Sequence, residues 1–212
     1  MVGRMLKCGI ATAVSLALTV QFGQAQASSP RAQLADLLLW GADTTPSITG
    51  LTPALQSEVD RYRRRWAAYK RGLRPTQDST MTMVRDNQVR YERRLVAIGR
   101  TPQARTLAAA YVKALRPCYE WEGFHDCPER EAQFADSYQG AHSAGPFREY
   151  LPLLAGHRWL CAAEGYQYEK SFTNVDRTRA EYERAIAVAL KSPDQLVRAS
   201  AEELKKRGTC FP

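Results

Sequence analysis

The sequence lacks long alternating runs of valine, isoleucine and threonine, the pattern that marks half-buried β-strands. Alanine, arginine, glutamate and leucine dominate the chain instead, and these residues favour helices. The predicted fold class is therefore all-α, an antiparallel bundle of about six to eight helices.

Motifs for catalysis and cofactor binding are absent as well. The chain contains no HExxH zinc motif, no phosphate-binding loop, no glycine-rich dinucleotide fingerprint and no recognisable Ser-His-Asp arrangement. It has only 3 histidines, so acid–base chemistry would depend mainly on carboxylates. His157 is expected to be a hydrogen-bonded core residue and His142 a loop residue. We therefore expect no cofactor and no metal, and an enzyme is the less favoured class of protein.

The first 35 residues contain no acidic side chain. Arg4 and Lys7 precede an apolar stretch over residues 8–20, and the sequence AQA at residues 25–27 has the pattern of a signal-peptidase site. The stretch is shorter than the roughly 20 residues of a membrane span, and no later segment could form one. Residues 1–27 are thus predicted to be a cleaved signal peptide, with an uncleaved anchor as the alternative. The mature protein is expected to be periplasmic or secreted.

Signal cleavage would leave four cysteines in an oxidising compartment. An even number there indicates two disulfides, which could form in three pairings. We favour Cys118–Cys127, which closes a short loop, together with Cys161–Cys210, which ties the C-terminus to a core helix. The alternative, a zinc site at Cys118, His125 and Cys127, needs thiolates, which do not persist where disulfides form.

Residues 118–127 (CYEWEGFHDC) hold the densest group of ionisable and aromatic side chains. Two carboxylates in this loop could act on a glycosidic bond only if they lay about 5 Å or 6.5–9.5 Å apart across a sugar. The structural interpretation is a disulfide-closed loop with solvated carboxylates, in which Trp121 and Phe124 pack onto the core. The candidate loop site consists of Glu120, Trp121, Glu122 and His125.

Helix boundaries follow from capping residues, prolines and glycines. Ser29-Pro30, Thr52-Pro53 and Thr101-Pro102 are expected to begin helices. Ser192 is expected to form a capping box with Gln195 at the start of the last helix. The predicted helices cover approximately residues 30–40, 53–73, 81–98, 102–116, 128–138 and 193–207, with a helical hairpin between the last two.

Two of the long helices carry narrow apolar seams. Apolar residues are spaced 4-3-4-3-4 over residues 55–73 and 3-4-3-4-3 over residues 81–98, where Gln88 is the sole polar member. Matched seams joined by a short connection predict an antiparallel helical hairpin. Gly99 is expected to end the second helix in the usual C-terminal role of glycine.

The C-terminal half contains a repeat-like pattern. The sequence WLCAAEGY at residues 159–166 has the spacing W-x2-A-A-x2-Y, and Tyr182, Ala185 and Pro193 follow at related positions. Over residues 157–193 the chain resembles one tetratricopeptide repeat, whose first helix has the pattern W-x2-L-G-x2-Y. The resemblance implies a close-packed helical hairpin and a protein-binding role, and it identifies no binding residues.

The excess positive charge belongs to the N-terminal half of the mature chain. Residues 28–116 contain 16 lysines and arginines against 7 acids, whereas residues 117–212 contain 12 against 15. Arg64, Arg71 and Arg94 lie outside the seams, so reversing their charges is expected to leave the fold intact. A solvated surface, partly neutralised by neighbouring acids, is the alternative to a binding face. The candidate polyanion- or partner-binding face consists of Arg61, Arg64, Arg65, Arg71, Arg90 and Arg94.

These features predict one all-α domain over residues 28–212, with a basic half (28–116) and a disulfide-stapled half (117–212). The expected function is non-enzymatic binding of a macromolecular partner, either a protein or an anionic envelope component such as a polymer or a lipid headgroup. Nucleic acid is a poor candidate for an exported protein, and head-to-tail homo-oligomers are compatible with the charge layout. The alternatives are an inhibitor or immunity protein for a cell-wall enzyme, and a helical hydrolase or lyase acting on envelope polysaccharide.

Overall fold

A computed structural model describes residues 28–69, 79–118 and 123–211. The predicted signal peptide, Arg71, Leu73 and the loop residues 120–122 lie outside these ranges. The described residues form helices and no strand, which confirms the all-α prediction. The helices are α1 (Pro30–Trp40), α2 (Pro53–Ala68), α3 (Ser79–Gly99), α4 (Gln103–Leu115), α5 (Asp126–Ala141), α6 (Leu151–Tyr168), α7 (Phe172–Ala189) and α8 (Gln195–Arg207).

The first two helices begin at the predicted capping residues. The Ser29 hydroxyl accepts a hydrogen bond from the backbone N–H of Ala32, and the Thr52 hydroxyl accepts one from Leu55. A proline occupies the first turn of each helix, where its missing N–H leaves no helical bond unmade. These short-range interactions fix the start of α1 and of α2.

The start of α8 differs from the prediction. Asp194 is the capping residue, and its carboxylate accepts hydrogen bonds from the backbone N–H groups of Leu196 and Val197. Ser192 lies two residues earlier, and its hydroxyl donates to Glu149 and accepts from the Asp194 N–H. The predicted capping box was wrong because a carboxylate closer to the helix satisfies the free N–H groups.

Helix α3 ends at Gly99, as predicted, but the reason given for a glycine at this position was wrong. Gly99 is the last residue of α3, and the positive φ of 58° falls on Arg100. A Cβ atom on Gly99 would lie 2.7 Å from the Cβ of Ala104 and 2.9 Å from the ring of Phe147. Glycine is needed here because α3 and α4 approach closely, and left-handed backbone geometry is not the cause.

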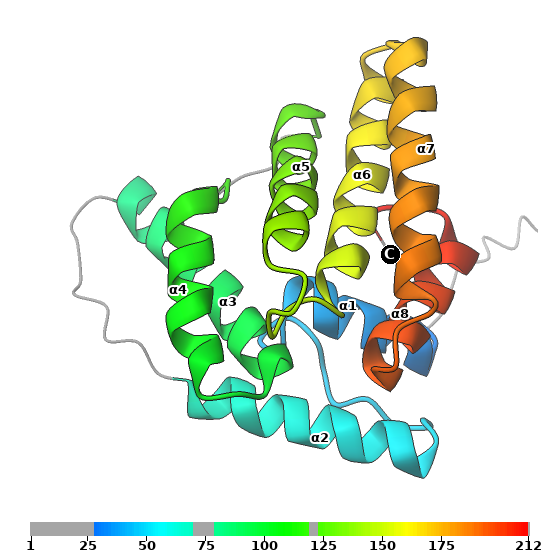
Figure 1. Cartoon of the computed structure of the whole chain (residues 1–212). Helices are drawn as coiled ribbons and strands as arrows, with labels where there is room; N and C mark the ends of the chain where they lie inside the picture. The colour runs from blue at the N-terminus through cyan, green and yellow to red at the C-terminus, as the bar shows by residue number, and fades with distance from the viewer. Residues whose placement is uncertain (1–27, 70–78, 119–122, 212) are drawn as a thin grey trace, which may run out of the picture.

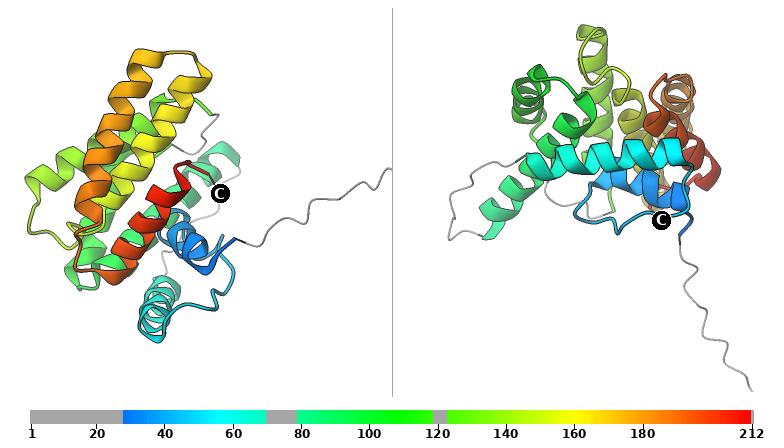
Figure 2. Two further views of the ribbon diagram at one scale, coloured as in Figure 1. Left: turned by 90° about the vertical axis from the view of Figure 1, so that its right-hand side faces the viewer. Right: turned by 90° about the horizontal axis from the view of Figure 1, so that it is seen from below.

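Helix α6 is the centre of the C-terminal half (Figure 1). It is buried along nearly its whole length and lies between α5 and α7. It forms an antiparallel hairpin with α7, as the sequence predicts, while α8 packs beside α1 (Figure 2). A helix that is apolar on all sides is expected to be surrounded by others.

The seams of the N-terminal half are buried unequally. Leu55, Val59, Tyr62 and Trp66 of α2 are all buried. On α3 the buried part of the seam runs from Tyr91 to Ile98, whereas Met81 is 43% exposed and Gln88 is half-buried. Helix α3 packs against α2 and, more extensively, against α4, so its buried face at the C-terminal end is wider than one seam.

Both predicted disulfides are present. Cys118 and Cys127 have Cα atoms 6.0 Å apart, and those of Cys161 and Cys210 are 4.8 Å apart. The second bond joins α6 to the segment after α8. Among the helices of the described ranges, none is both long enough and apolar enough to traverse a bilayer.

Candidate functional site

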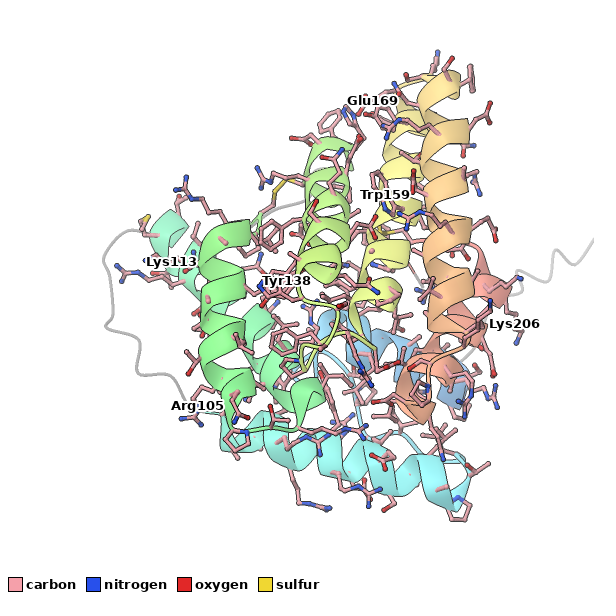
Figure 3. All side chains as sticks on the ribbon, viewed as in Figure 1. Arg105, Lys113, Tyr138, Trp159, Glu169 and Lys206 are labelled. Carbon is pink, nitrogen blue, oxygen red and sulfur yellow. A yellow bond between two sulfur atoms is a disulfide. The ribbon has the colours of Figure 1, made fainter. Side chains whose placement is uncertain are left out.

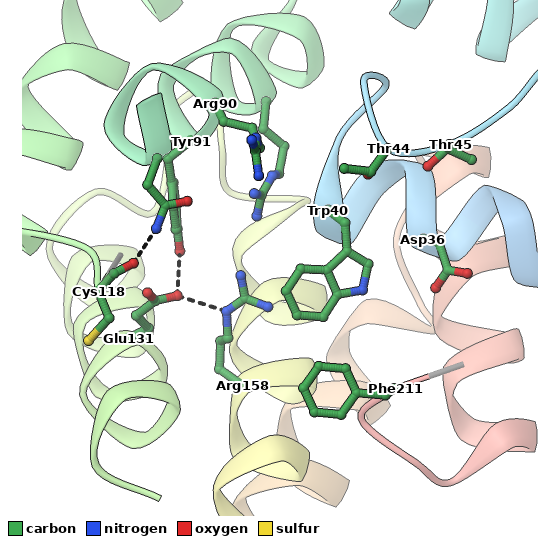
Figure 4. A pocket seen from close by; sticks show the side chains of 12 residues that line it. Asp36, Trp40, Thr44, Thr45, Arg90, Tyr91, Cys118, Glu131, Arg158 and Phe211 are labelled. Atoms are coloured by element: carbon green, nitrogen blue, oxygen red, sulfur yellow. Dashed lines mark hydrogen bonds and ion pairs between the residues drawn. The ribbon is translucent and has the colours of Figure 1, made fainter. Parts of the chain in front are cut away.

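A pocket of about 430 Å³ lies where α1, α3, α5 and α6 meet (Figure 4). Cavities of this size accept small molecules or a single chemical group of a larger one. Three arginines line it: Arg90 and Arg94 from α3 and Arg158 from α6. The other lining residues are Asp36, Trp40, Thr44, Thr45, Asn87, Tyr91, Cys118, Glu131 and Phe211.

Arg158 and Glu131 form a buried ion pair at the base of the pocket. The side chains are each 2% exposed, and Arg158 Nε donates to Glu131 Oε2 at 2.8 Å. The Tyr91 hydroxyl donates to the same oxygen at 3.4 Å. Burial raises the pKa of Tyr91, and the nearby carboxylate adds to this, so the hydroxyl keeps its proton. A charge at this depth is tolerated because it is paired.

Arg94 has no such carboxylate partner among the residues that the structure describes. It is 3% exposed, and its guanidinium lies over the ring of Tyr91 at 4.7 Å. Tyr150 also interacts with this guanidinium. In the described part of the chain, Nε and Nη1 are buried and have no hydrogen-bond partner. Buried charged donors without partners are costly, so an anion in the pocket would gain from contact with them.

The pocket is therefore positive on balance. Arg90 is exposed, and Figure 4 shows its guanidinium and that of Arg158 directed toward the same space. The two lining carboxylates are both engaged, Glu131 with Arg158 and Asp36 with Arg207 at 2.9 Å. Three guanidinium groups around one cavity favour a carboxylate or a phosphate, which they can bind with charge-assisted hydrogen bonds.

Aromatic rings form the opposite wall. Trp40 stacks on Phe211, with centroids 5.8 Å apart and planes 10° from parallel. The rings of His157 and Trp40 are nearly perpendicular, with centroids 5.0 Å apart, and the Arg158 guanidinium lies 5.1 Å from the centre of the Trp40 ring. Phe211 directly follows Cys210, so the disulfide to Cys161 fixes the place of this ring.

His157 is a hydrogen-bonded core residue, as predicted. Its Nε2 lies 2.9 Å from the Cys210 carbonyl oxygen, which can only accept, and its Nδ1 lies 2.6 Å from Arg158 Nη1, which can only donate. Burial and the charge of Arg158 hold the pKa of His157 well below its usual value, so the ring is neutral. Cys161 and Cys210 lie beside the imidazole, but their sulfurs are bonded to each other and are not thiolates.

We expect the free energy of unfolding to decrease as the pH falls below about 6.5. Unfolded His157 takes up a proton near that pH, whereas the folded ring, with its depressed pKa, does not. The unfolded state then binds more protons, so His157 costs stability by up to about 1.4 kcal/mol per pH unit until the folded pKa is reached. Urea unfolding at pH 6.5 and 5.5 measures this loss. His157→Gln should show a smaller loss, and equal losses in both proteins would contradict the assignment.

The predicted loop site is only partly within the described residues. Glu120, Trp121 and Glu122 lie outside them. His125 stacks on Tyr166 at 3.9 Å, and its Nδ1 lies 2.7 Å from a carboxylate oxygen of Glu169. Glu169 sits at the C-terminal end of α6 (Figure 3), so His125 is held against α6.

The expectation that Phe124 packs onto the core was wrong, because this side chain is 46% exposed. The main chain of the loop packs against α6 where the ring of Phe124 was expected. A Cβ atom on Gly165 would lie 2.6 Å from the backbone nitrogen of His125, so residues 124–125 approach α6 through their main chain. The ring of Phe124 is thereby turned outward.

The predicted arginine face on α2 is partly occupied by contacts within the chain. Arg61 pairs with Glu58, and the half-buried Arg65 donates a hydrogen bond to the carbonyl of Ala97. Arg64 is exposed. These contacts tie α2 to itself and to α3, and they reduce the charge that the surface offers to a polyanion.

Placing Arg94 on an exposed face was wrong. The residue is buried next to Tyr62, Tyr91 and Tyr150, so reversing its charge would place a carboxylate in the core. The predicted tolerance of that change is therefore also wrong. Arg90 is exposed, but at the mouth of the pocket.

Sequence reasoning missed Arg158, Glu131 and Trp40 as site residues. One signal for Arg158 was present, because His157 and Arg158 interrupt an otherwise apolar run over residues 151–163. A charge within such a helix is retained only where it is paired or used. Glu131 and Trp40 carry no comparable local signal.

No protein-family model, characterised protein or solved structure matches this chain. Its function therefore has to be inferred from the geometry of the pocket.

Proposed function

We propose that the protein is an exported, non-enzymatic binding protein that takes an anionic group of an envelope partner into the pocket between α1, α3 and α6. The partner is a protein or an envelope component that presents a carboxylate or a phosphate. Two disulfides support a location in an oxidising compartment. The positive pocket supports the choice of an anion, because its lining carboxylates are both paired with guanidinium groups.

Arg94 carries the proposal. Its buried Nε and Nη1 have no hydrogen-bond partner among the described residues, and they belong to a side chain that lines the pocket. Nε and Nη1 lie on different edges of the guanidinium, so a carboxylate or phosphate would accept from one of them, together with Nη2 where it binds in bidentate fashion. Catalysis by the lining carboxylates is not favoured, since each is already engaged by an arginine.

We expect Arg94→Met to weaken binding of acetate and inorganic phosphate by at least about tenfold, since a hydrogen bond to a charged group contributes roughly 1.5–3 kcal/mol. Isothermal titration at physiological ionic strength, where exposed charges are screened beyond about 8 Å, measures this, with chloride as the reference anion. Methionine is unbranched and apolar and replaces the aliphatic part of the arginine side chain, so the variant should fold, which circular dichroism checks.

Arg64→Met is the matched control, because it removes the same charge from an exposed position on α2. Its anion affinity should stay within about twofold of that of the wild type, since exposed charges act weakly over distance. Equal affinities in the wild type and the Arg94 variant, or no binding by the wild type, would refute the proposed function.

A further inference from the structure

A second hollow of about 430 Å³ shares Phe211 with the pocket that Arg90, Arg94 and Arg158 line. We call that first cavity the arginine pocket. We call the second hollow the apolar groove, and its lining includes Phe124, Pro128, Cys161, Gly165, Tyr168 and Phe211. Glu164 also borders it, but one carboxylate oxygen accepts a hydrogen bond from the backbone N–H of Cys210 at 2.8 Å. The described lining contains no arginine or lysine, in contrast to the pocket.

Phe211 belongs to both cavities. Figure 4 shows its ring below Trp40, across from Arg158. Phe211 is 51% exposed, so it offers apolar surface where it lines the two cavities. A ligand that occupies both cavities would cross this ring.

The groove also gathers exposed aromatic side chains. Phe124 is 46% exposed and Tyr168 is 75% exposed, with ring centroids 6.3 Å apart. Together with Phe211 they place three solvent-exposed aromatic side chains around one hollow. Clustered apolar exposure of this kind marks binding sites, whereas single exposed residues are ordinary.

We propose that the pocket and the groove form one bipartite site for a single-chain amphiphile, an unbranched alkyl carboxylate. The inference rests on the proposed function and names its ligand class. The carboxylate contacts Arg94 and Arg90, and the chain crosses Phe211 into the apolar groove. Charge complementarity selects this occupant over a polyanion, because a second anionic group in the groove would meet Glu164 and no cation among the described lining residues.

The test is a series of acetate, hexanoate, octanoate and decanoate, each titrated below its critical micelle concentration. We expect affinity to rise by up to about fourfold per methylene buried, until the groove is filled. Decanol, which lacks the charge, should bind at least about tenfold more weakly than decanoate, because it gains no charge-assisted hydrogen bond from the arginines.

Two variants separate the head from the chain. Tyr168→Ser should reduce the gain per methylene and leave acetate affinity unchanged, whereas Arg94→Met should weaken every carboxylate and preserve the gain. Phe172→Ser is the matched control, because this aromatic residue is 67% exposed and does not line the groove. It should behave as the wild type does.

The outcomes distinguish this inference from the proposed function. If acetate and phosphate bind but decanoate binds no more tightly, the bipartite site is refuted and the anion pocket stands. If decanol equals decanoate, or if the protein binds anionic vesicles without saturable decanoate binding, the amphiphile assignment is refuted. If no anion binds, the proposed function fails and this inference fails with it.

Discussion

Glu131→Ala is expected to lower the free energy of unfolding by about 3–5 kcal/mol. The Glu131 carboxylate is the buried partner of Arg158, at 2.8 Å, and both side chains are 2% exposed. Alanine would remove this carboxylate from a guanidinium that stays at the same depth. The cost arises from the charge that remains buried on Arg158 more than from the loss of an attraction.

Chemical denaturation measures the change, and the melting temperature should fall by about 6–20 °C for a domain of this size. Glu181→Ala is the matched control, because Glu181 pairs with Arg184 at 2.7 Å where both side chains are well exposed. Its loss should cost less than about 1 kcal/mol.

The double variant Glu131→Ala/Arg158→Met tests the cause. If the charge that remains buried on Arg158 explains the loss, removing both charges should recover much of the stability. If the free energy of unfolding of Glu131→Ala lay within about 1 kcal/mol of the wild-type value, the stabilising role of the ion pair would be contradicted. A double variant less stable than the single one would contradict the proposed cause.

Features encoded by neighbouring residues could be predicted from the sequence. Ser29 and Thr52 cap their helices because the capping bond spans only three residues. The disulfide pairing could be predicted from the shortness of the first loop, together with the prediction that residues 1–27 are a signal peptide. Asp194 shows the limit of such reasoning, since the predicted cap Ser192 lies two residues before it and the Asp194 carboxylate accepts from the first free N–H groups of the helix.

The burial of Arg94 could not be predicted from a narrow seam. Arg94 adjoins the seam residues Tyr91 and Leu95, and a seam model leaves it outside. The chain packs α3 against both α2 and α4, and Arg94 interacts with Tyr62 of α2 and with Tyr150. Each additional neighbour widens the buried face of a helix beyond its seam.

The pocket itself depends on contacts between distant parts of the sequence. Trp40 and Phe211 stack although they belong to opposite ends of the described chain. Arg207 reaches back to Asp36, and Arg31 pairs with Glu202, across the same packing of α1 on α8. No local pattern specifies that packing, so the site depends on the way the helices pack against one another.

Replacing Cys161 and Cys210 together by alanine is expected to reduce the free energy of unfolding by about 4 kcal/mol. The bond spans 49 residues, and in the chain-entropy model a cross-link of that length removes much of the freedom of the unfolded chain. The same change at Cys118 and Cys127, 9 residues apart, should cost about 2.7 kcal/mol. Denaturant unfolding of the two double variants compares them directly.

The loss of this disulfide should also change ligand binding, if the bipartite site is correct. Cys210 holds the following ring, Phe211, between the arginine pocket and the apolar groove. Without the bond the segment after α8 is freer, so the gain in affinity per methylene should shrink. Acetate affinity, which depends on Arg94, should change by less than about threefold. If the variant without Cys161 and Cys210 were as stable as the wild type, the stabilising role of the bond would be refuted. An unchanged gain in affinity per methylene would show that stacking on Trp40 alone holds the ring of Phe211 in place.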